Sequence, residues 1–131
     1  MNDCENEVYT RVATVLREKF PGINLAGEYV KAPSAFPHVS IVQSDTVTVY
    51  MKTTDTRQYD RLLFEINIYS NKATGKKTEC KAIAKEIDRI MFSMNFRRMS
   101  MTPVPNMENE SIYRIVARYR VTTDGKYFYR R

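Results

Sequence analysis

The sequence is poor in the residues from which most catalytic and metal sites are built. Its 131 residues include one histidine, two cysteines and no tryptophan. A histidine-based metal site would lack partners for His38, and a serine triad would have this single residue as its base. The composition therefore predicts a protein that is not an enzyme, with no catalytic, cofactor-binding or metal-binding residue.

Cysteine is too scarce for a disulfide scaffold. Cys4 lies in a polar segment near the amino terminus, and Cys80 lies on an apolar helical stripe. Two unpaired thiols in a reducing compartment explain this pattern more simply than a disulfide does. The stripe position also predicts that Cys80 is buried and therefore unreactive.

Long apolar runs are lacking as well. The longest span only a few residues, whereas a membrane-crossing helix needs roughly 20. The first residues, MNDCENEVY, are acidic and have neither the basic start nor the apolar stretch of a secretory signal. We therefore expect synthesis in the cytoplasm, no membrane partner, and one domain over residues 1–131.

Positive charge is in excess. The formal net charge is +6 and the pI is near 9.4. This balance favours an acidic partner, which is nucleic acid, an anionic membrane or an acidic protein surface. Excess charge also keeps small proteins in solution, so the net charge alone leaves these alternatives open.

The most informative segment runs from Asp60 to Met94. Apolar and polar residues first alternate, which predicts a strand over 62–69 with Leu62, Phe64, Ile66 and Ile68 on its packed face. After a short polar turn, apolar residues recur every three or four positions, which predicts an amphipathic helix over 78–94. Its buried stripe would hold Cys80, Ile83, Ile87, Ile90, Met91 and Met94.

The residues before this segment predict another helix and several short strands. Helical periodicity extends over residues 3–20, with Asn2 or Asp3 as the cap and Pro21 and Gly22 at the end. Strands are expected over 23–31, 39–41 and 47–51, with a proline-containing loop over 32–37. The polar run 52–58 reads as the tip of a long hairpin.

The residues after it predict two more strands, over 95–102 and 111–123. On the second, Tyr113, Ile115, Ala117, Tyr119 and Val121 share one face, and Arg114, Val116, Arg118 and Arg120 share the other. A turn at Asp124 and Gly125 leads to a basic, aromatic tail. The whole pattern predicts an α+β fold, in which two helices pack on a small, mostly antiparallel sheet with a projecting hairpin and loops.

Two short patterns point to ligand binding. Gly75-Lys76-Lys77-Thr78 is similar to the end of a phosphate-binding loop, but position 70, where that loop needs glycine, is serine. A plain helix start fits better. Arginines beside Tyr113, Tyr119, Tyr127 and Tyr129 are compatible with a module that stacks single-stranded nucleic acid, although no recognisable RNA-binding motif is present. This module is the alternative function.

The order of the motifs resembles a known family. The chain contains FPGI at 20–23, FPHVSI at 36–41, FEINIYSN at 64–71, AIAKEIDRIM at 82–91, NFRR at 95–98 and YRIVARYR at 113–120. This succession is similar to the tail terminator, or tail completion, proteins of tailed bacteriophages, which are also described as head–tail joining or minor capsid proteins. The resemblance covers nearly the whole chain.

The resemblance implies a structural role in virion assembly. Such proteins form a hexameric ring on the last ring of tail-tube subunits, stop tube growth and present the surface on which the head connector docks. The resemblance also implies the partners: other copies of the chain, the tube protein, the head completion protein and, in a contractile tail, the sheath. DNA would pass through the ring without sequence-specific binding, and the protein would lie at the head-proximal end of the tail after assembly in the bacterial cytoplasm.

The strongly basic carboxyl terminus departs from the family pattern. Arginine suits carboxylates and phosphates alike because its planar group donates hydrogen bonds in pairs. We therefore expect the interface to include residues of the hairpin, the arginine strand and the tail: Tyr50, Lys52, Arg57, Tyr59, Arg114, Arg118, Arg120, Lys126, Arg130 and Arg131.

Overall fold

The computed structural model describes residues 3–30, 33–49, 59–105 and 111–129. In chain order the elements are α1 (Glu5–Lys19), β1 (Asn24–Ala26), β2 (His38–Val49), β3 (Tyr59–Ser70), α2 (Lys76–Ser93), β4 (Arg97–Pro103), β5 (Tyr113–Thr123) and β6 (Phe128–Tyr129). The strands form one sheet in the order β1-β2-β3-β5-β4, and β6 pairs with β5. Only β1 and β2 run parallel, so the predicted α+β fold with a mostly antiparallel sheet is confirmed.

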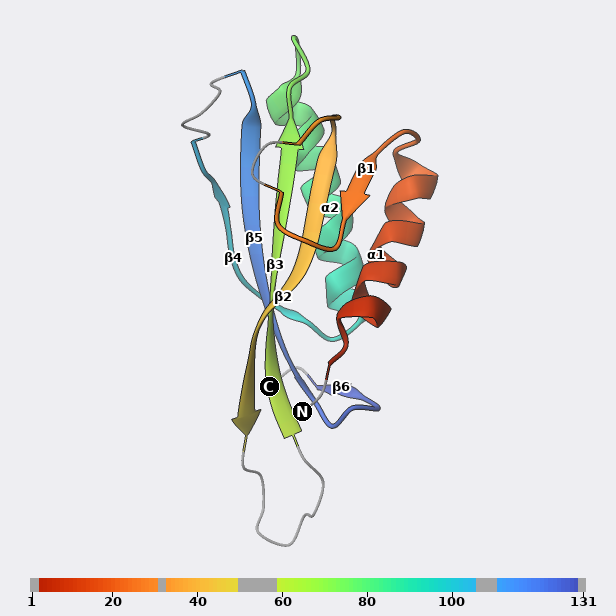
Figure 1. Cartoon of the computed structure of the whole chain (residues 1–131), viewed down its shortest axis with the longest axis vertical. Coiled ribbons are helices and arrows are strands. Elements are labelled where there is room, and N and C mark those ends of the chain that lie inside the picture. The colour runs from red at the N-terminus through yellow and green to blue at the C-terminus, as the bar shows by residue number, and fades with distance from the viewer. Residues whose placement is uncertain (1–2, 31–32, 50–58, 106–110, 130–131) are drawn as a thin grey trace, which may run out of the picture.

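The core lies between the sheet and the two helices, which cover the same face (Figure 1). The alternating residues of β3 and the stripe of α2 form this core as the sequence predicts, and Phe64 and Ile87 are fully buried in it. The helix α2 contacts β3, β4 and β5, while α1 contacts β2 and α2. Burial of apolar side chains on both elements is therefore what holds the two layers together.

The helices begin and end near the predicted residues. Cys4 precedes α1, and the Asp3 carboxylate accepts a hydrogen bond from the Glu5 backbone N–H at 3.1 Å. Gly75 precedes α2 with φ of 90°, a left-handed conformation that glycine adopts without a steric penalty. The Gly-Lys-Lys-Thr sequence is therefore a helix start. Among the described residues, neither helix is long and apolar enough to cross a membrane.

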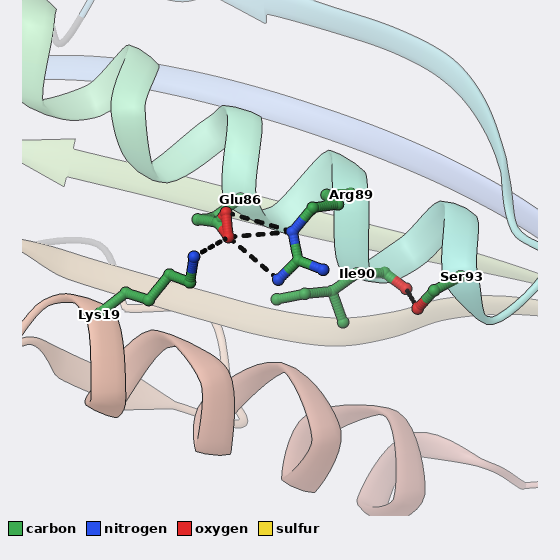
Figure 2. A network of polar contacts seen from close by, with 5 residues as sticks. All are labelled: Lys19, Glu86, Arg89, Ile90 and Ser93. Carbon is green, nitrogen blue, oxygen red and sulfur yellow. Dashed lines mark hydrogen bonds and ion pairs between the residues drawn. The ribbon is translucent and has the colours of Figure 1, made fainter.

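A charged contact joins the two helices on the surface of the helix layer (Figure 2). Glu86 of α2 lies 3.1 Å from the Lys19 ammonium of α1 and 3.0 Å from the Arg89 guanidinium. The hydrogen bond from Lys19, with that from Arg89, lowers the pKa of the Glu86 carboxyl. One turn further on, the Ser93 hydroxyl donates to the Ile90 carbonyl.

The strand β2 is longer than predicted. The sequence indicates two short strands, over 39–41 and 47–51, whereas a single strand runs from His38 to Val49. A register shift between Gln43 and Asp45 breaks the alternation, which is why residues 42–46 do not look like a strand in the sequence. Pairing with β3 continues to Val49 and Tyr59, so the predicted hairpin exists and projects past the helices (Figure 1). Its tip, residues 50–58, lies outside the described residues.

The segment after β1 corrects a second prediction. The strand expected over 23–31 contains only Asn24–Ala26, because the chain then leaves the edge of the sheet and passes across the face opposite the helices (Figure 1). We call this face the open face. Tyr29 of the crossing segment lies with its ring 5.9 Å from the Arg114 guanidinium of β5.

The last described residues, Phe128 and Tyr129, form the short strand β6, and Phe128 packs against the core, whereas the sequence predicts a short tail. Phe128 of β6 packs against Phe96 with ring centroids 5.6 Å apart, and Phe96 packs edge-on against Phe64 at 5.4 Å. Such aromatic contacts each contribute about 0.5–1.5 kcal/mol beyond burial. The turn at Asp124 and Gly125 is as predicted, and the Asp124 carboxylate accepts the backbone N–H groups of Lys126 and Tyr127.

Candidate interaction surfaces

The two cysteines are free thiols that lie in the core. Burial raises the pKa of the Cys80 thiol to about 12, and it also raises that of Cys4. Neither sulfur is therefore a thiolate near neutral pH, which is the form a nucleophile or a metal ligand requires. Among the described residues, no three His, Cys, Asp or Glu side chains lie close enough together to hold a metal ion.

His38 is a structural residue at the start of β2. It is 2% exposed, its Nδ1 accepts a hydrogen bond from the Asn24 amide at 2.9 Å, and its ring lies 5.9 Å from that of Tyr69. Burial lowers the pKa of its imidazole. The residue therefore joins β1 to β2 in its neutral form.

Arg114 is held within the protein at the covered end of the open face. Its guanidinium donates two hydrogen bonds to the Asn67 side-chain oxygen, at 3.0 and 2.7 Å, and lies 5.6 Å from the centre of the Tyr69 ring. With Tyr29 on its other side, this arginine packs the crossing segment against the sheet. The contacts explain why Arg114 is only partly exposed despite its position on the arginine face of β5.

The uncovered half of the open face carries several arginines that we call the basic strip: Arg61 of β3, Arg97 of β4, and Arg118 and Arg120 of β5. Arg97 and Arg120 are direct cross-strand partners, an arrangement in which like charges repel. Arg118 has 53% of its side chain exposed and lies 3.6 Å from the Glu65 carboxylate. The strip therefore contains one partly neutralised arginine and three without a carboxylate partner among the described residues.

The basic strip also has unused donors. The Nε atoms of Arg61 and Arg120 are buried and make no hydrogen bond within the described part of the chain. Leaving a buried donor unpaired costs about 1–3 kcal/mol, and carboxylates or phosphates accept from arginine in pairs. An anionic partner would meet the exposed guanidinium groups of Arg97 and Arg118 first, and the buried Nε atoms add positive charge beneath them.

The remaining predicted interface residues are not gathered at this strip. Tyr59 is 5% exposed at the start of β3, with its ring 6.2 Å from that of Tyr129. Lys126 lies in the exposed turn before β6, 5.3 Å from the centre of the Tyr127 ring. The other predicted positions, Tyr50, Lys52, Arg57, Arg130 and Arg131, lie outside the described residues.

Two of the four tyrosines expected beside the arginines, Tyr113 and Tyr119, lie on the other side of the sheet. Tyr119 is 1% exposed and donates to the Asp88 carboxylate of α2 at 3.0 Å, and Tyr113 packs against the core. Burial, reinforced by Asp88, raises the pKa of the Tyr119 hydroxyl. Neither ring is therefore available beside the basic strip for stacking on a base.

Sequence reasoning missed Arg61 and Arg97. Alternation around Leu62 places Arg61 on the side opposite the core, and this signal was available in the sequence. The position of Arg97 beside Arg120 depends on the register between β4 and β5, which includes a shift between Arg98 and Ser100. A single sequence does not specify such a register.

Comparison with solved structures finds a similar fold in a chain of a virion structure. A chain of a structure described as "Virion of native gene transfer agent (GTA) particle" superposes with a TM-score of 0.69. The match covers 88% of this chain and 90% of that chain, at 16% sequence identity. No protein-family model and no curated protein matches the sequence. The likeness therefore shows a fold that the two chains share over nearly their whole lengths.

Proposed function

We propose that the protein is a structural, non-enzymatic component of a phage-like virion. The observation that carries this proposal is the shared fold with a chain of the gene transfer agent virion, which extends over about nine-tenths of both chains. The order of the sequence motifs, which resembles that of tail terminators, supports the same class of protein independently of the superposition.

Within that class we propose the role of tail terminator. The protein would form a hexameric ring on the last ring of tube subunits, stop tube growth and present the docking surface for the head connector. The fold suits this role because a rigid two-layer body leaves the β2–β3 hairpin projecting past the helices (Figure 1). Projecting hairpins offer contacts to neighbours without disturbing the core.

The basic strip is the surface we propose for the tube or connector protein. Arginines with unpaired donors match an acidic protein surface, and charges at such a joint set both the rate of association and the choice of partner. The hairpin tip and the tail, with Tyr50, Lys52, Arg57, Lys126, Arg130 and Arg131, would extend the contact. In a contractile tail the sheath would be a further neighbour, and DNA would pass through the ring without base-specific contacts.

Removal of the gene from the element that encodes it tests the role. Electron micrographs of the resulting particles should show tubes of uncontrolled length and tails without heads, and the wild-type gene supplied in trans should restore complete particles. As a test in solution, purified tube subunits should stop growing when the protein is added. Complete, infectious particles from the deletion strain would rule out the proposed role.

A further inference from the structure

Charge is unevenly distributed across the sheet. The described residues before residue 50, which form α1, β1 and β2, contain six Asp or Glu and three Lys or Arg. The described residues after residue 58 contain six Asp or Glu and thirteen Lys or Arg. Because β1 and β4 are at opposite ends of the strand order, one end of the sheet is acidic and the other is basic.

The acidic end has a hollow between the start of α1 and the segment after β1. Glu5, Tyr9, Ala26, Glu28 and Val30 line its volume of about 430 Å³. Asp3, Glu7 and Glu28 are exposed, while the Glu5 carboxylate accepts the Gln43 backbone N–H at 2.7 Å. We call this surface, with Asp3, Glu5, Glu7 and Glu28, the acidic edge.

The basic end is formed by β4 and the neighbouring side of α2. Among the described strands β4 pairs only with β5, so the backbone groups along its outer side are unpaired within the sheet. The irregularity between Arg98 and Ser100 leaves the Met99 side chain 50% exposed. Lys81 and Lys85 of α2 and Arg97 and Arg98 of β4 are exposed here, with Arg98 3.4 Å from the Asp88 carboxylate, and we call the surface the basic edge.

A groove runs along the basic edge between α2 and β4. It has a volume of about 320 Å³ and is lined by the apolar Ala84, Met101 and Ile115 and by three cations, Lys81, Lys85 and Arg98, which outnumber the one carboxylate, Asp88. The groove thus combines apolar surface with a cationic border. An acidic partner that also brings apolar side chains matches both properties.

We infer that the acidic edge of one copy docks on the basic edge of the next copy. The two surfaces are complementary in charge, each is hollowed, and they lie at opposite ends of one rigid sheet, so every copy presents both. A contact between two different surfaces repeats from copy to copy and closes into a ring when the rotation allows. This inference rests on the proposed function and specifies how the ring would be built.

The charges on β4 also oppose pairing between two copies of this edge strand. Arginines on an edge strand repel another copy of the same edge. They would therefore exclude symmetric pairing of two β4 strands while leaving the acidic edge as the favoured partner. This selectivity is what a head-to-tail contact requires.

A pair of charge-reversed variants tests the contact. In one variant, Lys81→Glu and Lys85→Glu remove the net positive charge of the basic edge, and in the other, Glu7→Lys and Glu28→Lys remove the net negative charge of the acidic edge. A matched control, Arg17→Glu with Lys72→Glu, changes net charge as much as the first variant but at exposed positions away from both edges. All three should remain folded, because exposed charge changes alter stability by about 0.5 kcal/mol or less.

Self-association is measured by sedimentation velocity at low salt and high protein concentration, with and without purified tube subunits. The wild type and the control should associate, and each edge variant should associate about tenfold more weakly or worse, since one side of the contact has lost its net charge and like charges then face each other at the substituted positions. An equimolar mixture of the two edge variants should regain association, because the unchanged acidic edge of one variant then meets the unchanged basic edge of the other. Zero-length carboxyl–amine cross-linking of the wild type should join Glu28 of one copy to Lys81 or Lys85 of another.

Several results would overturn the inference. They are a mixture that fails to associate, edge variants that associate like the wild type, or a wild type that yields no cross-link between copies either alone or on tubes. A cross-link from Lys85 to the tube protein alone would identify that protein as the occupant instead. The deletion experiment tests the proposed role separately. If the deletion gives defective tails but the mixture of edge variants does not associate, the role stands and only the contact between the two edges is ruled out.

Discussion

Replacement of Ile87 by aspartate should unfold the protein. Ile87 is 0% exposed on the stripe of α2, within the cluster that joins this helix to β3 and β5. Truncation of such a side chain to alanine costs about 2–5 kcal/mol, and an unpaired carboxylate in the same place adds several kcal/mol for lost hydration. The sum of about 5–10 kcal/mol is comparable with the whole stability of a domain, which is about 5–15 kcal/mol.

Circular dichroism during heating and urea unfolding measure the effect. Ile87→Asp should lack a cooperative transition at neutral pH, while Ile87→Ala should unfold cooperatively at a Tm roughly 10–20 °C below that of the wild type. Ala82→Asp is the matched control, because residue 82 is exposed on the same helix and the change costs about 0.7 kcal/mol in helix propensity. An Ile87→Asp variant with the wild-type Tm would show that the stripe is not the core.

Further predictions concern the basic strip, the buried thiol and the buried histidine. Arg118→Glu should leave the Tm nearly unchanged but block tail completion, and Arg17→Glu is its control. Normal tails from the Arg118→Glu variant would show that the basic strip is only solvated surface. Cys80, with its pKa raised to about 12 by burial, should resist an aromatic disulfide reagent at pH 8 until urea unfolds the protein. The lowered pKa of His38 means that its contribution to stability is present above pH 6.5 and is lost as pH falls through the folded-state value. The Tm should therefore decrease between pH 7.5 and 5.5, and His38→Gln should weaken this decrease; an unchanged slope would contradict the assignment.

The sequence predicts the core well because the pattern of apolar residues in each core element is regular and can be recognised within that element alone. Alternation in β3 and the three-to-four spacing in α2 identify buried faces that the structure confirms, including Phe64 and Ile87. Helix ends are also predicted closely, since proline and glycine at positions 21 and 22 stop α1. These signals are local, so they need no knowledge of the partner element.

The parts that could not be predicted depend on pairing between distant segments. The pairing of β2 with β3 carries the strand through the irregularity near Ser44, where alternation fails. The segment containing Tyr29 crosses the open face, where Tyr29 packs against Arg114, which in turn lies against Tyr69. No periodicity in residues 27–37 indicates this path. For the same reason the sequence predicts one role for Arg114 and Arg118. In the structure Arg114 is partly buried against Tyr29 and Tyr69, whereas Arg118 is exposed.

The projecting hairpin determines how the protein bears mechanical load. The strands β2 and β3 pair continuously, apart from one irregularity, from His38 and Tyr69 to Val49 and Tyr59. The central strand β3 is paired with β5 on its other side, as far as Asp60 and Thr123. A pull on the tip along the strand axis draws β2 and β3 in the same direction, so it loads the hydrogen bonds between β3 and β5 together in shear, which resists rupture better than opening them one at a time. Force applied at the tip would thus pass to the middle of the sheet through the pairing of β3 with β5.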